Sequence, residues 1–159
     1  MFKTSIFAAA TALLFAAPAF AEINVHDSYA RASSPVAKSG AAFLVIQNTG
    51  EADRLIGVSS DAAAKTELHT HLEDDNGVMR MIHVEEGFEL PADGEIAMQR
   101  GGKHVMLMGL TDPFEQGDVI SITLTFENAG DMVIEVPVDL ERQDQEMMEH
   151  GDMNKASDN

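Results

Sequence analysis

The chain has 159 residues and carries 10 basic against 27 acidic side chains, a formal net charge of −17. That length suits one compact domain, and the negative charge argues against nucleic acid as a partner, because phosphates would be repelled over most of the surface. The sequence contains no cysteine, which excludes disulfides, thiolate nucleophiles and metal centres that need a thiolate ligand.

The N-terminal residues have the pattern of a cleavable export signal. Lys3 precedes an apolar stretch from Ile6 to Ala17, and Ala19-Phe20-Ala21 fits an A-x-A cleavage sequence. A membrane anchor is the alternative, but the apolar stretch is short for a bilayer span and Pro18 interrupts it. We therefore predict a signal peptide over residues 1–21 and a mature protein that is exported to the periplasm without membrane insertion.

Residues 22–140 are predicted to form one all-β domain. Apolar and polar residues alternate, most clearly from Ile120 to Phe126, so one face of each strand packs and the other is solvated. Turn-forming sequences such as Asp75-Asn76-Gly77 separate the strand patterns. The predicted strands cover 23–25, 42–47, 54–58, 66–72, 78–84, 95–98, 104–110, 120–126 and 132–138. Many short strands without long helical patterns predict an antiparallel β-sandwich or barrel.

The middle of the domain is rich in metal-binding side chains. Residues 69–108 hold four of the six histidines and five of the ten methionines. Because alternate residues of a strand share a face, each of three strands presents a stripe of soft or borderline ligands. The three stripes are His69 and His71; Met79, Met81 and His83; and His104, Met106 and Met108.

These stripes predict a site with two imidazoles and two thioethers. If 66–72 and 78–84 form a hairpin centred on Asp75, the pattern places His69 opposite Met81 and His71 opposite Met79. The hairpin then supplies one imidazole and one thioether, and His104 with Met106 supplies the same pair from a third strand.

Cuprous copper is the ion that best matches such a set, because Cu(I) favours thioether sulfur and imidazole, whereas magnesium, calcium and zinc do not favour thioethers. Both imidazoles must be neutral to bind, so the affinity should fall as the pH drops through the histidine range. Core filling by methionine and hydrogen-bonded histidine is the simpler interpretation of single residues such as His83, Met79 or Met98. It does not explain imidazoles beside thioethers on three strand faces.

Residues 141–159 are predicted to form an acidic flexible tail, since they lack a strand pattern and have little apolar area to offset the cost of ordering. The tail contains soft side chains that could bind a further metal ion weakly, although such a methionine pair is more commonly inert. These side chains are Met147, Met148, His150 and Met153.

The chain also resembles the periplasmic PCu(A)C-type copper chaperones. The specific landmarks are Glu67-Leu68-His69, Gly77-Val78-Met79-Arg80-Met81 and Gly101-Gly102-Lys103-His104-Val105-Met106-Leu107-Met108, supported by Gly40-Ala41-Ala42-Phe43 leading to Asn48 and by Pro91-Ala92. The resemblance implies a cupredoxin-like Greek-key fold, copper ligands at His69, Met81, His104 and Met106, and delivery of copper to the Cu(A) centre of cytochrome c oxidase. The ligand spacings are about one residue longer than in that family, which keeps His71 open as an alternative first ligand. Some members carry a second, cupric site in a tail that Met147 to Met153 resemble.

The predicted function is that of a monomeric Cu(I) metallochaperone, not an enzyme. It would pass copper by ligand exchange to an accepting protein, either a cytochrome c oxidase subunit or another copper chaperone. A copper storage or scavenging protein without a dedicated acceptor is the main alternative. An enzyme or electron-transfer centre is disfavoured, because cysteine is absent and no nucleophile lies beside a base. An exported β-domain that only binds another protein is a further alternative, and it predicts no retained copper.

Overall fold

The computed structural model describes residues 23–142, and all of the regular secondary structure in this range is β-strand. The strands are β1 (Ile23–Ala32), β2 (Ser39–Asn48), β3 (Asp53–Ser59), β4 (Ala63–Glu73), β5 (Met79–His83), β6 (Phe88–Leu90), β7 (Glu95–Met98), β8 (His104–Leu110), β9 (Val119–Phe126) and β10 (Gly130–Pro137). Within these residues no helix is long and apolar enough to cross a membrane. The predicted signal peptide and the soft side chains of the tail lie outside the described residues.

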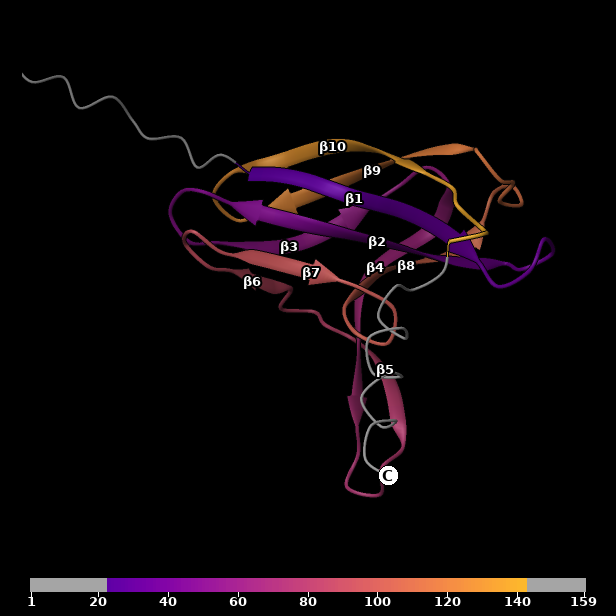
Figure 1. Cartoon of the computed structure of the whole chain (residues 1–159), viewed down its shortest axis with the longest axis horizontal. Helices are drawn as coiled ribbons and strands as arrows, with labels where there is room; N and C mark the ends of the chain where they lie inside the picture. The colour runs from indigo at the N-terminus through magenta and orange to yellow at the C-terminus, as the bar shows by residue number, and fades with distance from the viewer. Residues whose placement is uncertain (1–22, 143–159) are drawn as a thin grey trace, which may run out of the picture.

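The strands form two antiparallel sheets that face each other (Figure 1). The larger sheet has the order β1-β2-β8-β4-β5. Strand β7 pairs with the second half of β2, beyond the part of β2 that pairs with β8. The smaller sheet has the order β10-β9-β3-β6. The chain therefore changes sheet after β2, β3, β5, β6 and β8, as in a sandwich. The predicted antiparallel β-sandwich is confirmed.

The core lies between the two sheets and is built by the alternation that the sequence displays. Side chains from both inner faces are withdrawn from solvent, and burying each large aliphatic one stabilises the fold by about 1.5–3 kcal/mol. The most buried include Leu44, Val105 and Leu107 from the larger sheet and Leu55, Ile122, Leu124 and Phe126 from the smaller. A parallel bridge between Ala30 and Val138 closes one side of the sandwich.

Two strand predictions needed correction. The first strand, predicted to end at Val25, continues to Ala32. A bulge between His26 and Tyr29, with Asp27 at φ 52°, shifts the register and so interrupts the alternation that identifies a strand. The short strand β6 was not predicted, because three residues are too few to show a period.

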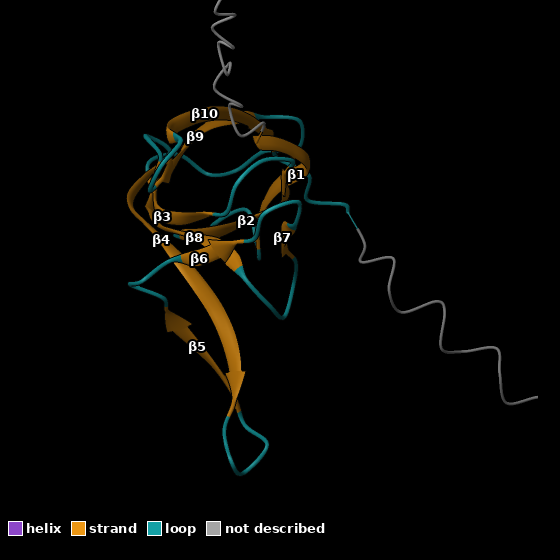
Figure 2. Ribbon diagram, turned by 90° about the vertical axis from the view of Figure 1, so that its left-hand side faces the viewer, coloured by secondary structure: helices purple, strands orange, loops and turns teal. Residues whose placement is uncertain are grey.

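A two-stranded arm, residues 69–83, extends from the sandwich (Figures 1 and 2). Strand β4 pairs with β8 from Ala63 to His69 and with β5 from His69 to Glu73. Strand β5 pairs only with β4, and all five of its side chains are exposed. The histidine and methionine stripes therefore run from the body of the larger sheet onto this arm.

Candidate metal site

The candidate ligands gather on the outer face of the larger sheet, where β8, β4 and β5 are neighbours. His69 lies directly opposite His104, and Glu67 lies opposite Met106. The intervening Leu68 and Val105 are buried in the sandwich core, so the histidines and Met106 face the other way. The sheet thus brings His69, His104 and Met106 together on one face.

The hairpin register differs from the prediction by two residues. His69 pairs with His83, and His71, rather than His69, pairs with Met81. The reason lies in a three-residue turn, Asp75 to Gly77, whose last residue has a positive φ of 78° that glycine tolerates. The turn is closed by a 2.9 Å hydrogen bond from the Asp74 N–H to the Val78 carbonyl. A shift of two residues leaves every side chain on its predicted face, and Met81 becomes a diagonal neighbour of His69.

Aromatic rings cross this face in a row, and His104 stands at its centre. The row runs through Tyr29, Phe43, His104, His69 and His83, with ring-centroid distances of 5.1, 6.1, 5.8 and 5.7 Å. His71 lies beside it, 5.2 Å from His104. At the Tyr29 end of the row, the Arg142 guanidinium stacks 4.2 Å from the Tyr29 ring and pairs with Asp27 at 2.5 Å. The first residues of the predicted tail are therefore held against β1.

His104 is held with one ring nitrogen available. Its ring is buried, and Nδ1 lies 2.9 Å from the Gly102 carbonyl oxygen. A carbonyl only accepts, so Nδ1 carries the proton and Nε2 keeps its lone pair. Burial lowers the pKa of His104, and His71 and His69 lower it further, although the Gly102 hydrogen bond raises it. The ring is therefore held in the neutral form that a metal requires.

The loop between β7 and β8 supplies that carbonyl. Gly101 has a φ of 79°, and the Gly102 N–H donates to the Gln99 carbonyl at 3.0 Å, which forms a tight turn. This turn also brings the Gly102 oxygen to 3.4 Å from His71 Nδ1. The glycine pair was predicted only as a landmark, and its role in orienting His104 was not.

His69 is held in the opposite sense. Its Nε2 lies 2.9 Å from Glu67 Oε2, whereas its Nδ1 is buried without any hydrogen-bond partner. A buried polar atom left without a partner costs about 1–3 kcal/mol. His69 Nδ1 is therefore a candidate metal-binding atom, because neither solvent nor a protein donor occupies it.

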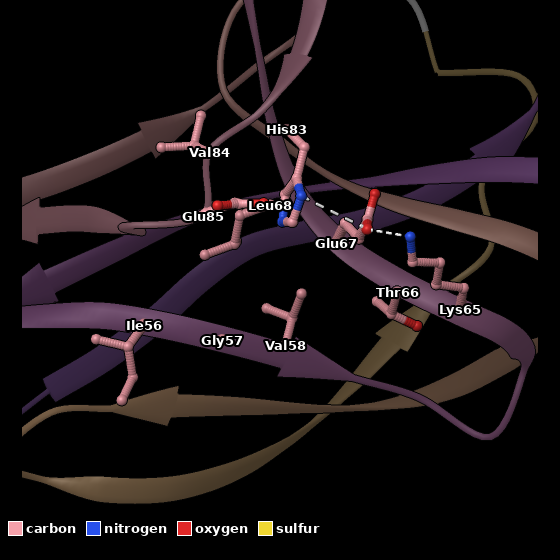
Figure 3. A pocket seen from close by; sticks show the side chains of 10 residues that line it. All are labelled: Ile56, Gly57, Val58, Lys65, Thr66, Glu67, Leu68, His83, Val84 and Glu85. Atoms are coloured by element: carbon pink, nitrogen blue, oxygen red, sulfur yellow. Dashed lines mark ion pairs between the residues drawn. The ribbon is translucent and has the colours of Figure 1, made fainter.

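Glu67 is a site residue that the sequence analysis missed, although it lies two residues from His69 on the same strand face. Its other oxygen, Oε1, is 2.5 Å from the Lys65 ammonium and 3.6 Å from His83 Nδ1. Lys65 first and then His69 lower the pKa of Glu67 to about 2. Lys65, Glu67 and His83 line a hollow of about 240 Å³ between β3, β4 and the chain after β5, and Figure 3 shows their side chains there.

The methionines divide into three environments. Met98 is buried in the sandwich core and cannot reach the outer face. Met106 and Met108 are half-buried on β8, whereas Met79 and Met81 on the arm are 53% and 47% exposed. Among residues 23–142 no three histidine or acidic side chains are arranged to hold a metal ion.

Residues 23–138 match the family model described as "Putative lipoprotein LpqE-like". The chain belongs to the LpqE-like family. A curated relative, "Putative lipoprotein Lxx21020" of Leifsonia xyli, is 38% identical over 99 residues, which cover 62% of the LpqE-like chain. The chain spans 59% of that relative's length.

Solved structures share the fold of the LpqE-like chain. The copper-bound PCuAC domain from PmoF2 has a TM-score of 0.60 at 24% identity, covering 74% of the chain and 92% of that domain. Apo-DR1885 from Deinococcus radiodurans has a TM-score of 0.59 at 26% identity, covering 88% and 93%. The CuI form of DR1885 has a TM-score of 0.58 at 27% identity, covering 79% and 84%. The PCu(A)C-type resemblance predicted from the sequence is confirmed.

Proposed function

We propose that this LpqE-like protein binds one Cu(I) ion at His69, His104, Met106 and Met81 and passes it to another protein. The observation that carries the proposal is the pair of adjacent imidazoles, each with one nitrogen held by a protein acceptor and the other left for a ligand. Neutral imidazole beside thioether is a donor set that suits Cu(I). The solved CuI form of DR1885, which shares the fold, supports the choice of metal.

The uneven exposure of the ligands supports a role in transfer. His104 is buried, whereas Met81 is 47% exposed on a projecting arm. An incoming thiolate can displace the exposed thioether first, while the imidazoles still hold the ion. Copper would then pass through a shared-ligand intermediate without release of the free ion.

We also propose that the protein works in the periplasm and delivers copper to an acceptor there. The export pattern in residues 1–21 and the lipoprotein names of the family model and of the Leifsonia xyli relative support a protein that works outside the cytoplasm, in the periplasm. The Cu(A) centre of cytochrome c oxidase is the proposed destination, by resemblance to the PCu(A)C-type chaperones. His71, which faces Met81 across the arm, is the alternative to His69 as first ligand.

Anaerobic Cu(I) titration with X-ray absorption tests the binding step. We expect one copper per chain, with two sulfur and two nitrogen neighbours. The chain offers matched controls, since Met79 shares the strand, face and exposure of Met81, and Met108 shares those of Met106. M81I and M106I should each lose one sulfur neighbour, whereas M79I and M108I should lose none. A protein that retains no copper after desalting would contradict the proposal.

A transfer assay separates a chaperone from a storage protein. The Cu(I)-loaded protein is mixed with the apo form of a soluble Cu(A) domain, and the copper content of each is measured after separation. A chaperone transfers copper in the presence of a chelator that traps only free ion. Retention of the copper by the LpqE-like protein would favour storage.

A further inference from the structure

The two candidate imidazoles present different nitrogens. The Gly102 carbonyl fixes the proton of His104 on Nδ1, so its lone pair is on Nε2. The Glu67 carboxylate, which only accepts, fixes the proton of His69 on Nε2, so its lone pair is on Nδ1. Nδ1 of His69 is also the buried atom that has no hydrogen-bond partner.

We infer, on the basis of the proposed function, that Glu67 is a positioning residue whose carboxylate makes His69 bind copper through Nδ1 while His104 binds through Nε2. Partners of this kind set the tautomer and the ring orientation of metal-binding histidines. Glu67 also places a negative charge next to the ion, opposite Met106.

The carboxylate itself is held in place. The Glu67 side chain is 12% exposed, and Oε1 is fixed by Lys65 at 2.5 Å and by His83 at 3.6 Å. Its rotation away from His69 would break the ion pair with Lys65 and the contact with His83. Strand β4 offers a matched control in Glu73, which is on the same face but is exposed and lies opposite Met79.

The test uses ring-¹⁵N-labelled protein, because the ring nitrogen shifts show which atom carries a proton and which binds the metal. Cu(I) is diamagnetic, so the same spectra can be recorded with and without copper. In the native apo protein we expect a His69 Nε2 proton that exchanges slowly with water. In the Cu(I) form we expect copper on His69 Nδ1 and on His104 Nε2.

Variants at Glu67 separate positioning from a purely structural role. E67A should weaken Cu(I) binding by about 10- to 100-fold and lose the slow Nε2 proton of His69. E67Q, whose amide oxygen can accept the same hydrogen bond, should recover part of the affinity and keep copper on Nδ1. E73A should change neither measurement. A variant that only loses stability would bind copper through the native nitrogens once folded.

Copper on His69 Nε2 in the native protein, or an E67A variant with native affinity, would overturn the inference. A native protein that binds no Cu(I) would instead overturn the proposed function. In that case the spectra of the apo protein alone decide whether Glu67 orients His69, and loss of the slow Nε2 proton in E67A but not in E73A supports it.

Discussion

Asp53 and His69 are both polar side chains withdrawn from solvent, but only one has all its hydrogen bonds. Asp53 Oδ1 accepts from the backbone N–H groups of Arg54 at 2.7 Å and Asn128 at 2.9 Å, and Oδ2 accepts from that of Ala129 at 2.9 Å. His69 has a bond at Nε2 and none at Nδ1. The Asp53 carboxylate fastens β3 to the turn between β9 and β10, whereas the His69 ring has a nitrogen without a partner, which is the atom proposed to bind a metal ion. The contacts of Asp53 hold the fold together, and the unpartnered nitrogen of His69 fits the proposed metal site.

Removal of the His104 imidazole, which lies at the centre of the candidate site, should have the largest effect on copper binding. H104Q should lower the Cu(I) affinity by more than about 100-fold, since loss of a residue that only hydrogen-bonds to a metal ligand already costs about 10- to 100-fold. The glutamine amide can still donate to the Gly102 carbonyl, so the fold should persist. Competition with a Cu(I) chelator measures the affinity, and circular dichroism checks the fold. An unchanged affinity would remove His104 from the ligand set.

D53N should have the opposite pattern of effects: it should lower the stability of the fold and leave the metal site intact. Asparagine replaces one accepting oxygen by a donating amide, which opposes the N–H groups that now point at Asp53. We expect the free energy of unfolding of the apo protein to fall by about 2 kcal/mol, measured in urea. The Cu(I) affinity should stay native. A parallel loss of affinity would show that the contacts of Asp53 and the metal site are not independent.

A smaller effect should appear with pH. Burial alone would raise the pKa of Asp53, but its hydrogen bonds with Asn128, Arg54 and Ala129 outweigh this and hold it below its ordinary value of 3.8. The contribution of Asp53 to stability is therefore complete above that value and is lost as the pH falls through the lowered one. The difference in unfolding free energy between the native protein and D53N should be constant near neutral pH and shrink below about pH 4. A difference that grew on acidification would contradict this sign.

Alternation along the strands was enough to predict the sandwich and the faces of the candidate ligands. Strands 95–98 and 104–110 were predicted with the bounds they have, and the alternation of apolar and polar residues is clearest from Ile120 to Phe126 in β9. The hairpin was centred one residue too early, on Asp75 instead of Asn76, which moved the register by two and kept His69 and Met81 on one face. The error changed the cross-strand partners but left every side chain on its predicted face, because the shift was an even number of residues.

What could not be predicted depends on contacts between segments that are distant in sequence or on hydrogen-bond direction. A pattern of residue types does not say that the Gly102 carbonyl meets His104, nor that Lys65 and His83 converge on Glu67. It also cannot separate Met98, which fills the core, from Met106, which faces outward, because their parity has meaning only after the strands are paired.

Strand β5 has a consequence for the speed of metal exchange. It is paired along one edge only and none of its side chains is buried, so its opening should cost far less free energy than global unfolding. The thioether of Met81 can then detach together with its strand while the sandwich remains closed. Amide hydrogens of β5 should accordingly exchange faster than those of β8, and a bound metal ion should slow them.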